Sequence, residues 1–268
     1  MLRLSSTGSA IAQIATAKTV SLEAYTLHGP VLRALEDAAR RGAHVVVELE
    51  RTPDDSGNRH LKRENARVAA ELRRAHVDVK LDDPIHAKTI FVDGTLYLDE
   101  KNWNAGDIVL RDDDAAEAAS IPMTKHEALA EESRLLAQTK AGDGAIVESE
   151  SFGSGNATYS ALKALGLAGE APRLLVSEND LRGSQRERAA LEHLVRDGVR
   201  VRVCKDSAKL AASGKRAWLG SANATFAGGR WDMTDWGLCT GNADIVNAVR
   251  TRLETAWQSA KDFKLQKA

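Results

Sequence analysis

The sequence predicts an α/β chain made of two duplicated halves, and three observations carry this prediction. Short β-branched runs alternate with amphipathic helical patterns, which is typical of sheets covered by helices. The same order of strands and helices recurs in the second half of the chain. A set of polar and small residues also recurs at one constant spacing. We therefore expect two αβ repeats packed about a pseudo-twofold axis, with a site at their interface.

The composition is that of a globular protein. The 268 residues are enough to bury a core, and 43% of them are hydrophobic. Lys and Arg number 37 against 38 Asp and Glu, a formal net charge of −1, which argues against a protein that coats nucleic acid non-specifically. Two cysteines, Cys204 and Cys239, exclude a disulfide framework and lack the spacing of a zinc site.

The N-terminus and the apolar runs bear on localisation. The opening residues MLRLSSTGSA lack a basic segment followed by an apolar one, so we expect no signal peptide. No apolar run approaches the roughly 18 residues of a membrane span, so we expect no transmembrane segment. The cytoplasm is the expected location; a mature secreted chain whose leader had been removed would read the same way.

We expect the first half to begin with a strand followed by a helix, and small polar residues cap the start of that helix. Pro30 favours the start of a second helix, and Gly42 favours its end. The polar run that starts at Arg51 predicts a loop. The expected strands are Leu2–Ser6, Thr19–Tyr25, His44–Leu49 and Val77–Leu81, and the expected helices are Ala10–Ala17, a helix from Pro30 to Arg41, and Glu64–Arg74.

The second half repeats this order. Its expected strands are Ala145–Phe152, Arg173–Asn179 and Val199–Cys204, and its expected helices are Thr158–Leu167 and Arg186–Asp197. In this alignment Ala145–Phe152 matches the opening strand of the chain, so the boundary is expected near Lys140–Gly144. The two repeats are then residues 1–139 and 140–268, together forming one structural unit.

The chemistry is concentrated in the pattern His86-x-Lys88-x4-Asp93. On a strand, His86 and Lys88 point to the same face, because the side-chain period is two. An imidazole and an ammonium group so placed can converge on one phosphate, the histidine as nucleophile and the lysine as a point-charge ligand. A nearby Asp can select the tautomer of the imidazole. The pattern predicts phosphoryl chemistry at His86.

A second, altered copy follows at a fixed offset. The arithmetic is 207 − 86 = 121, 209 − 88 = 121 and 214 − 93 = 121. The same offset relates Leu98 to Leu219 and Asn102 to Asn223. Five coincident positions without a gap indicate a duplication.

The motif and its copy resemble the phospholipase D superfamily, whose members carry HxKxxxxD followed by a GSxN segment twice. The resemblance covers essentially the whole chain. It implies a phospholipase D-like fold and a phosphodiesterase that needs no metal or other cofactor and works through a phosphohistidine. By resemblance, the catalytic residues are His86, Lys88, Asp93 and Lys209. The phosphate-binding residues are Asn102, Ser207, Ser221 and Asn223.

This sequence departs from the family pattern in both copies. Ser207 stands where the family has its second histidine, Gly214 where it has Asp, and Asp99-Glu100 where Gly-Ser is usual. The missing histidine is the general acid, a role worth about 10²–10⁴ in rate. Three interpretations are open. In the first, the general acid comes from elsewhere in the site, and the candidates are Glu23, His28, Glu178 and Asp180. In the second, the leaving group needs no acid, and in the third, the protein binds its ligand without catalysis.

The substrate is expected to be a phosphodiester, with nucleic acid favoured over phospholipid. Basic residues cluster at 59–74 and 196–216, and Trp231 and Trp236 follow the GSAN segment. Those tryptophans suit a rim loop that stacks on a base or enters a lipid surface, or a packed loop that anchors the sheet. The alternatives are a phospholipase or phosphatidyl transferase, and an inactive phosphate-binding pseudoenzyme. A monomer is favoured, with a homodimer as the alternative.

Overall fold

The computed structural model describes residues 2–51, 53, 59–114, 121–181, 184–206, 208–229 and 232–265, without the side chains of residues 59–62, 122, 123, 179 and 180. The chain divides into two compact units. Unit 1 comprises Met1–Met123 and Met233–Trp236, and unit 2 comprises Thr124–Asp232 and Gly237–Ala268. The short segment Met233–Trp236 therefore comes from the second half of the sequence but belongs to the first unit.

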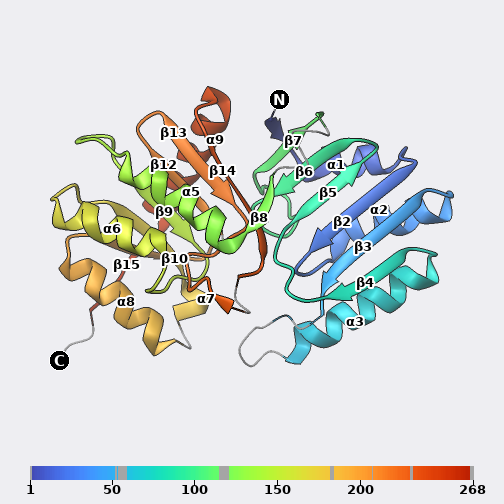
Figure 1. Cartoon of the computed structure of the whole chain (residues 1–268), viewed down its shortest axis with the longest axis horizontal. Helices are drawn as coiled ribbons and strands as arrows, with labels where there is room; N and C mark the ends of the chain where they lie inside the picture. Colours follow the sequence, from blue (N-terminus) through green and yellow to red (C-terminus); the bar gives the residue numbers. More distant parts are fainter. Residues whose placement is uncertain are drawn as a thin grey trace. The chain divides into compact units, whose positions relative to one another are not determined.

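Unit 1 is a seven-stranded mixed sheet with the strand order β1-β7-β6-β5-β2-β3-β4 (Figure 1). The strands β2, β3 and β4 are parallel, and β5, β6 and β7 continue the sheet antiparallel. The strands are β1 (Arg3–Ser5), β2 (Thr19–Ala24), β3 (His44–Glu50), β4 (Asp78–Asp82), β5 (Thr89–Val92), β6 (Thr95–Asp99) and β7 (Val109–Asp112). The helices are α1 (Thr7–Ile14), α2 (Gly29–Arg40) and α3 (Arg59–Arg74).

The helices of unit 1 begin where the sequence places its caps. The hydroxyl oxygen of Ser6 accepts a hydrogen bond from the Ser9 N–H at the start of α1. Pro30 lies in the first turn of α2, where its missing N–H has no intrahelical partner to lose. Gly42 follows α2 with a φ of 94°, a conformation that favours glycine. Helices and sheet enclose an aliphatic core that includes Leu22, Leu35 and Val47.

Unit 2 holds an eight-stranded sheet with the order β15-β11-β10-β9-β12-β13-β14-β8. The strands are β8 (Pro122–Thr124), β9 (Ile146–Ser149), β10 (Arg173–Ser177), β11 (Arg200–Cys204), β12 (Leu210–Ser213), β13 (Arg216–Gly220), β14 (Thr234–Thr240) and β15 (Lys261–Asp262). The helices are α5 (Lys125–Ala137), α6 (Ala157–Leu167), α7 (Glu178–Leu181), α8 (Gln185–Arg196) and α9 (Ala243–Ser259).

The two sheets share one topology, which confirms the predicted α/β class and the duplication. The order β1-β7-β6-β5-β2-β3-β4 matches β8-β14-β13-β12-β9-β10-β11, with β15 added at the edge. The strand registers give the residue equivalences. Glu23 pairs with Thr89 and Glu148 pairs with Leu210, and Leu210 is the counterpart of Thr89 at the offset 210 − 89 = 121. Glu148 is therefore the counterpart of Glu23.

The boundary between the repeats differs from the expected one at residues 139 and 140. The units divide between Met123 and Thr124, and α5 belongs to unit 2, where it packs on α6, β12 and β13. Its buried side chains include Leu129, Leu135 and Leu136. The counterpart of α1 is therefore α5, and the counterpart of β1 is β8 rather than Ala145–Phe152. Among the described residues, no helix combines the length and apolar character that a membrane crossing demands.

Candidate active site

His86 lies in the segment that joins β4 to β5, held against the start of β14. Its N–H donates to the Thr234 carbonyl oxygen at 3.0 Å, and the Thr234 N–H donates to the Pro84 carbonyl oxygen at 3.2 Å. Ile85 and Thr234 form an isolated parallel bridge. His86 and Lys88 therefore lie in the segment before β5, whereas the sequence predicted them on a strand. These two backbone hydrogen bonds with Thr234, which make up the bridge, nevertheless fix the backbone around His86.

The His86 imidazole has a defined partner at each nitrogen. Nδ1 lies 2.7 Å from Asp235 Oδ1, and Nε2 lies 3.1 Å from Lys88 Nζ. An ammonium group only donates, so Nε2 accepts from Lys88 and Nδ1 carries the proton that it donates to Asp235. This arrangement places the lone pair of the neutral ring on Nε2. The imidazole side chain is 12% exposed, whereas the Asp235 side chain is fully buried.

Asp235 was not among the residues predicted from the motif. It enters unit 1 with the segment Met233–Trp236, from the start of β14. Its neighbour Trp236 is fully buried and donates its indole N–H to the Asp99 carbonyl oxygen at 3.1 Å. This bond anchors the segment that carries the carboxylate. The available sequence signal was an Asp beside a tryptophan, 235 − 223 = 12 positions after the end of the GSAN segment.

Tyr25 completes the surroundings of His86 and was also missed. It follows β2, and its ring meets the imidazole edge-on with centroids 5.1 Å apart and an interplanar angle of 67°. Lys88 Nζ lies 5.8 Å from the centroid of the Tyr25 ring, within the range of a cation–π contact. Lys88 is 1% exposed and also donates to the His86 carbonyl oxygen at 2.6 Å.

Asp93, the third residue of the motif, does not orient His86 as expected. Its carboxylate accepts hydrogen bonds from the Lys18 N–H, the Thr19 N–H and the Thr19 hydroxyl, at 2.8 to 3.2 Å. Asp93 begins the tight turn from β5 to β6 and has a φ of 45°. The carboxylate therefore ties this turn to the start of β2, and these bonds lower the pKa of Asp93 below its ordinary value of 3.8.

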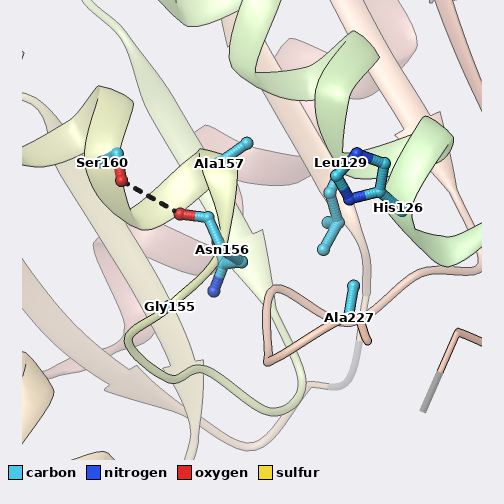
Figure 2. A pocket seen from close by; sticks show the side chains of 7 residues that line it. All are labelled: His126, Leu129, Gly155, Asn156, Ala157, Ser160 and Ala227. Carbon is cyan, nitrogen blue, oxygen red and sulfur yellow. Dashed lines mark hydrogen bonds between the residues drawn. The ribbon is translucent and has the colours of Figure 1, made fainter. Parts of the chain in front are cut away.

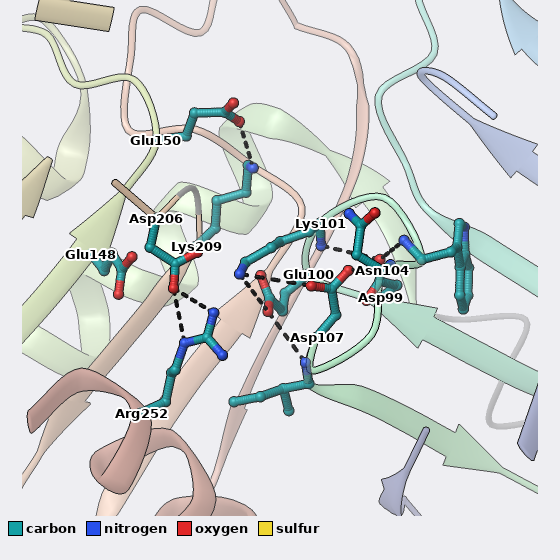
Figure 3. Close-up of polar contacts among 12 residues, drawn as sticks. Asp99, Glu100, Lys101, Asn104, Asp107, Glu148, Glu150, Asp206, Lys209 and Arg252 are labelled. Carbon is teal, nitrogen blue, oxygen red and sulfur yellow. Dashed lines mark hydrogen bonds and ion pairs between the residues drawn. The ribbon is translucent and has the colours of Figure 1, made fainter. Parts of the chain in front are cut away.

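The stretch that replaces Gly-Ser in the first copy is a buried acidic loop (Figure 3). Asp99 Oδ2 accepts from the Trp103 and Lys101 N–H groups, and Lys101 Nζ lies 3.7 Å from Asp107 Oδ1. Burial raises the pKa of Asp99 to about 7, with a further rise from Asp107. Asn102 is half-buried, and its Oδ1 has no hydrogen-bond partner among the described residues.

The residues of the second copy lie together in unit 2, at the ends of β9, β12 and β13. Lys209 Nζ forms an ion pair with Glu150 Oε2 at 2.8 Å, and the lysine side chain is 1% exposed (Figure 3). Asn223 Oδ1 accepts from the Ser151 N–H at 3.4 Å, and Ser221 is fully buried. Ser207 lies outside the described residues. The structure thus places Lys209 beside Glu150 and Asn223 beside Ser151.

Comparison with solved structures shows which fold this is. The chain superimposes over 98% of its length on phosphatidylserine synthase from Haemophilus influenzae Rd KW20, covering 87% of that chain with 11% identity and a TM-score of 0.68. Polyphosphate kinase from Porphyromonas gingivalis gives a TM-score of 0.64 over 96% of this chain with 14% identity. This chain has the phospholipase D-like fold. It spans about half the length of the polyphosphate kinase, 47% of that chain.

Comparison with the sequences of known proteins gives no assignment beyond the phospholipase D-like fold. No protein-family model matches the chain, and no curated protein matches it. A shorter overlap with a phospholipase D family member, Nuc from Salmonella typhimurium, covers 50% of this chain with 14% identity and a TM-score of 0.44.

Four side chains were predicted as alternative general acids for this fold. Glu23 faces Glu48 and Lys80 on the neighbouring strands, and burial raises its pKa, with a further rise from Glu48. His28 is exposed at the start of α2, and Glu178 is half-buried at the start of α7. The side chain of Asp180 lies outside the described residues. Each remains a prediction.

A pocket of about 300 Å³ in unit 2 is lined by none of the predicted site residues (Figure 2). It opens between the first turns of α5 and α6 and the loop after the GSAN segment. Its lining residues are His126, Leu129, Gly155, Asn156, Ala157, Ser160 and Ala227. Asn156 caps α6 by accepting from the Tyr159 N–H at 2.9 Å, so the Gly153–Asn156 turn acts as a helix cap.

Proposed function

We propose that the chain is a phosphoryl-transfer enzyme acting on a phosphodiester, with His86 Nε2 as the nucleophile. The observation that carries this proposal is the pair of contacts on one imidazole. Asp235 at Nδ1 and Lys88 at Nε2 select the tautomer whose lone pair is on Nε2. A nucleophilic histidine needs this tautomer, and a buried carboxylate is the group that holds it.

The proposed reaction has two steps. His86 Nε2 attacks phosphorus, the P–N bond forms, the P–O bond to the first alcohol breaks, and the departing alkoxide takes a proton from one of the four candidate general acids or from solvent water. Water then attacks the phosphohistidine and gives up a proton to the same acid or to solvent. The P–N bond breaks with its electron pair returning to Nε2, and the phosphate stays on the second product. The ring becomes cationic when Nε2 is phosphorylated, and the Asp235 carboxylate 2.7 Å from Nδ1 stabilises that charge.

Lys88 supplies the positive charge for the phosphate oxygens. Its ammonium group is in contact with the attacking nitrogen, so it lies where the phosphate must arrive. Binding of a phosphate oxygen then withdraws the Lys88 hydrogen bond from Nε2 and releases the lone pair for attack. His86 and Lys88 therefore act in sequence on the same group.

We propose nucleic acid rather than phospholipid as the substrate class. The phospholipid alternative depended on a membrane-docking loop carrying Trp231 and Trp236. Trp236 is fully buried and bonded to Asp99, and Trp231 lies outside the described residues. Among the residues that the structure describes, the large exposed hydrophobic side chains are scattered in sequence, at Leu4, Leu167, Phe226 and Leu265.

The basic clusters lend this choice less support than their sequence suggested. Arg67 pairs with Glu71 at 2.9 Å, and Arg73 donates to the Val79 carbonyl oxygen. Arg200 and Arg202 lie over the Trp257 ring, with guanidinium carbons 5.5 and 4.7 Å from its centroid. Much of the charge in both clusters is therefore engaged within the protein.

The test is hydrolysis of a single-stranded oligonucleotide with and without EDTA. We expect cleavage that survives EDTA and is lost in His86→Ala, together with an acid-labile phosphohistidine in the native chain. His44→Ala is the matched control, since His44 is exposed at the start of β3 in the same unit. Cleavage that persists in His86→Ala would overturn the proposal.

The same variants decide between the alternatives. Headgroup release from phosphatidylcholine vesicles, with no cleavage of the oligonucleotide, would assign the activity to phospholipid. Binding of phosphate with no turnover of either substrate, and no phosphohistidine, would assign a binding protein without catalysis.

A further inference from the structure

A second buried carboxyl group lies next to the proposed site, because Asp99 is directly opposite Lys88 in the sheet. The antiparallel register of β5 and β6 pairs Thr89 with Leu98. It continues with a hydrogen bond from the Asp99 N–H to the Lys88 carbonyl oxygen at 3.0 Å. Residues directly opposite each other share one face of an antiparallel sheet, so the two side chains are neighbours. Asp99 is fully buried and Lys88 is 1% exposed.

The hydrogen bonds of Asp99 favour its protonated form. Oδ2 accepts from the Lys101 and Trp103 N–H groups, within the loop that Figure 3 shows. Oδ1 is buried and has no hydrogen-bond partner among the described residues. A buried oxygen without a partner costs more free energy in a carboxylate than in a neutral carboxyl group, because burial penalises charge most strongly. A proton on Oδ1 therefore stabilises the buried side chain.

The charges in the loop of Asp99 act in the same direction. Lys101 Nζ lies 3.7 Å from Asp107 Oδ1 and 4.0 Å from Glu100 Oε1, so its ammonium group is shared between those two carboxylates. Burial and the Asp107 charge raise the pKa of Asp99 to about 7, against the opposing effect of Lys88. Asp99 therefore changes its charge near neutral pH, beside the lysine of the site.

Other charged side chains on the neighbouring elements have partners of their own. The residue opposite Asp99 on β7 is the aliphatic Val109. The charged pairs nearest along β7 and β14 are Arg111 with Asp113, and Asp235 with His86. Lys88 is the cation that the sheet register places directly opposite Asp99.

We infer that Asp99 is a positioning residue for Lys88: an ionised Asp99 holds the ammonium charge, and a protonated Asp99 leaves that charge to an anionic ligand. When a phosphate binds at Lys88 while Asp99 is ionised, one proton passes from solvent to Asp99 Oδ1. The inference rests on the proposed function, in which Lys88 binds the substrate phosphate, and it states how protonation regulates that binding.

The direction of the effect follows from the linkage between proton and anion. A bound anion repels an ionised Asp99, so it raises the pKa of Asp99 above that of the free protein. Below about pH 7 the free protein already holds the proton, and anion affinity is at its maximum. Affinity then falls as pH rises through this pKa, and it levels off above the higher pKa of the complex. Gly220 stands at this position in the second copy, since 220 − 99 = 121, and has no side chain to carry such a proton.

The test measures binding of inorganic sulfate to the full chain by isothermal titration calorimetry at pH 6 and pH 8. Sulfate is tetrahedral like phosphate, keeps a constant charge over this range, and gives no turnover. The native chain should bind sulfate roughly five- to tenfold more weakly at pH 8 than at pH 6. Lys88→Ala should lose this binding at both pH values.

Asp99→Asn removes the charge and keeps an oxygen for the Lys101 and Trp103 N–H groups. Its sulfate affinity should change less than about twofold between pH 6 and pH 8. Titration of His86 persists in this variant, so the pH dependence that the substitution removes belongs to Asp99. Binding heats at pH 7.5 in HEPES and in Tris, which differ in ionisation enthalpy, should show less proton uptake in Asp99→Asn than in the native chain.

Two further variants separate this role from a folding defect. Asp107→Asn should move the fall in affinity to lower pH, because the Asp107 charge raises the pKa of Asp99. A purely structural role of the loop would not move this profile. Asp113→Asn is the matched control, since it removes a carboxylate of the same unit that pairs with Arg111, and it should keep the native pH dependence.

The outcomes separate the inference from the proposed function. The inference is overturned if native affinity does not fall between pH 6 and pH 8, or if Asp99→Asn, folded by circular dichroism, shows the native pH dependence. Sulfate binding that survives Lys88→Ala, or a profile that Asp107→Asn leaves unmoved, overturns it as well. If the sulfate results hold but His86→Ala still cleaves the oligonucleotide, the proposed function alone fails.

Discussion

Replacing Asp235 by asparagine tests whether the buried carboxylate activates His86. The substitution keeps the size of the side chain at a position that is fully buried, so it changes charge with little change of shape. The contact it alters is the 2.7 Å hydrogen bond to His86 Nδ1. The neutral amide no longer stabilises the cationic ring that forms when Nε2 bonds to phosphorus.

The magnitude follows from that one contact. A hydrogen bond to a charged group contributes about 1.5–3 kcal/mol. Since about 1.4 kcal/mol is a factor of ten in rate, kcat should fall roughly 10- to 150-fold. If the amide turns its NH₂ group to Nδ1, the proton moves to Nε2 and removes the nucleophile, and the loss rises toward about 10⁴-fold, as for a triad histidine in the wrong tautomer.

The assay compares initial rates on bis(p-nitrophenyl) phosphate and on a single-stranded oligonucleotide. Because Asp235 acts on the nucleophile, the fall should be similar for the activated ester and for the oligonucleotide. A residue that assists the leaving group would affect the oligonucleotide far more. Asp93→Asn is the matched control, since that carboxylate bonds to Lys18 and Thr19. Activity of Asp235→Asn within threefold of the native chain, with His86→Ala inactive, would refute the reasoning.

Three stability predictions follow from other contacts. Asp93→Asn should lower the melting temperature at pH 7. Because the hydrogen bonds from Lys18 and Thr19 lower the pKa of the folded carboxyl, the difference in melting temperature should shrink as pH falls below the ordinary aspartate value of 3.8. A melting-temperature difference at pH 2 equal to that at pH 7 would contradict this. Burial raises the pKa of Glu132 to about 8 from an ordinary 4.5, so the unfolded chain loses this proton first and native stability falls between those values. Glu132→Gln should therefore stabilise the protein in thermal melts at pH 8 more than at pH 5, by up to about 1.4 kcal/mol for each pH unit crossed. Gly166→Ala should lower the free energy of unfolding, measured in urea, by about 1–3 kcal/mol. Alanine normally favours a helix, but here its Cβ would lie 3.1 Å from the carbonyl carbon of Asp197. A gain in stability would show that α6 can shift to make room for the methyl group.

The duplication could be predicted because matching residues recur at one constant offset in the sequence. The segment from His86 to Asn102 matches the segment from Ser207 to Asn223 without a gap. The strands β5 and β6 and their counterparts β12 and β13 lie within it, and they pair in the same antiparallel register. Where spacing drifts, the prediction failed: α5 was assigned to the first repeat, although its apolar side packs on β12 and β13.

The partners of His86 could not be predicted from the motif. Asp93 is the acidic residue nearest to His86 in the motif, but its carboxylate serves the turn between β5 and β6. Asp235 is 149 positions away from His86 in sequence, and only the bridge between Ile85 and Thr234 brings it to the imidazole. Tyr25 has no motif at all, and it reaches His86 because β2 pairs with β5.

The sequence by itself determined the α/β class and the two-fold repetition and predicted His86 as the nucleophile, because these depend on periodicity and on residues close together in the chain. The tertiary structure decided which groups contact the His86 imidazole. It replaced Asp93 by Asp235, added Tyr25, and paired Lys209 with Glu150. Hydrogen-bond and ion-pair partners are set by strand pairing between distant segments, and a single sequence does not encode that pairing in any local pattern.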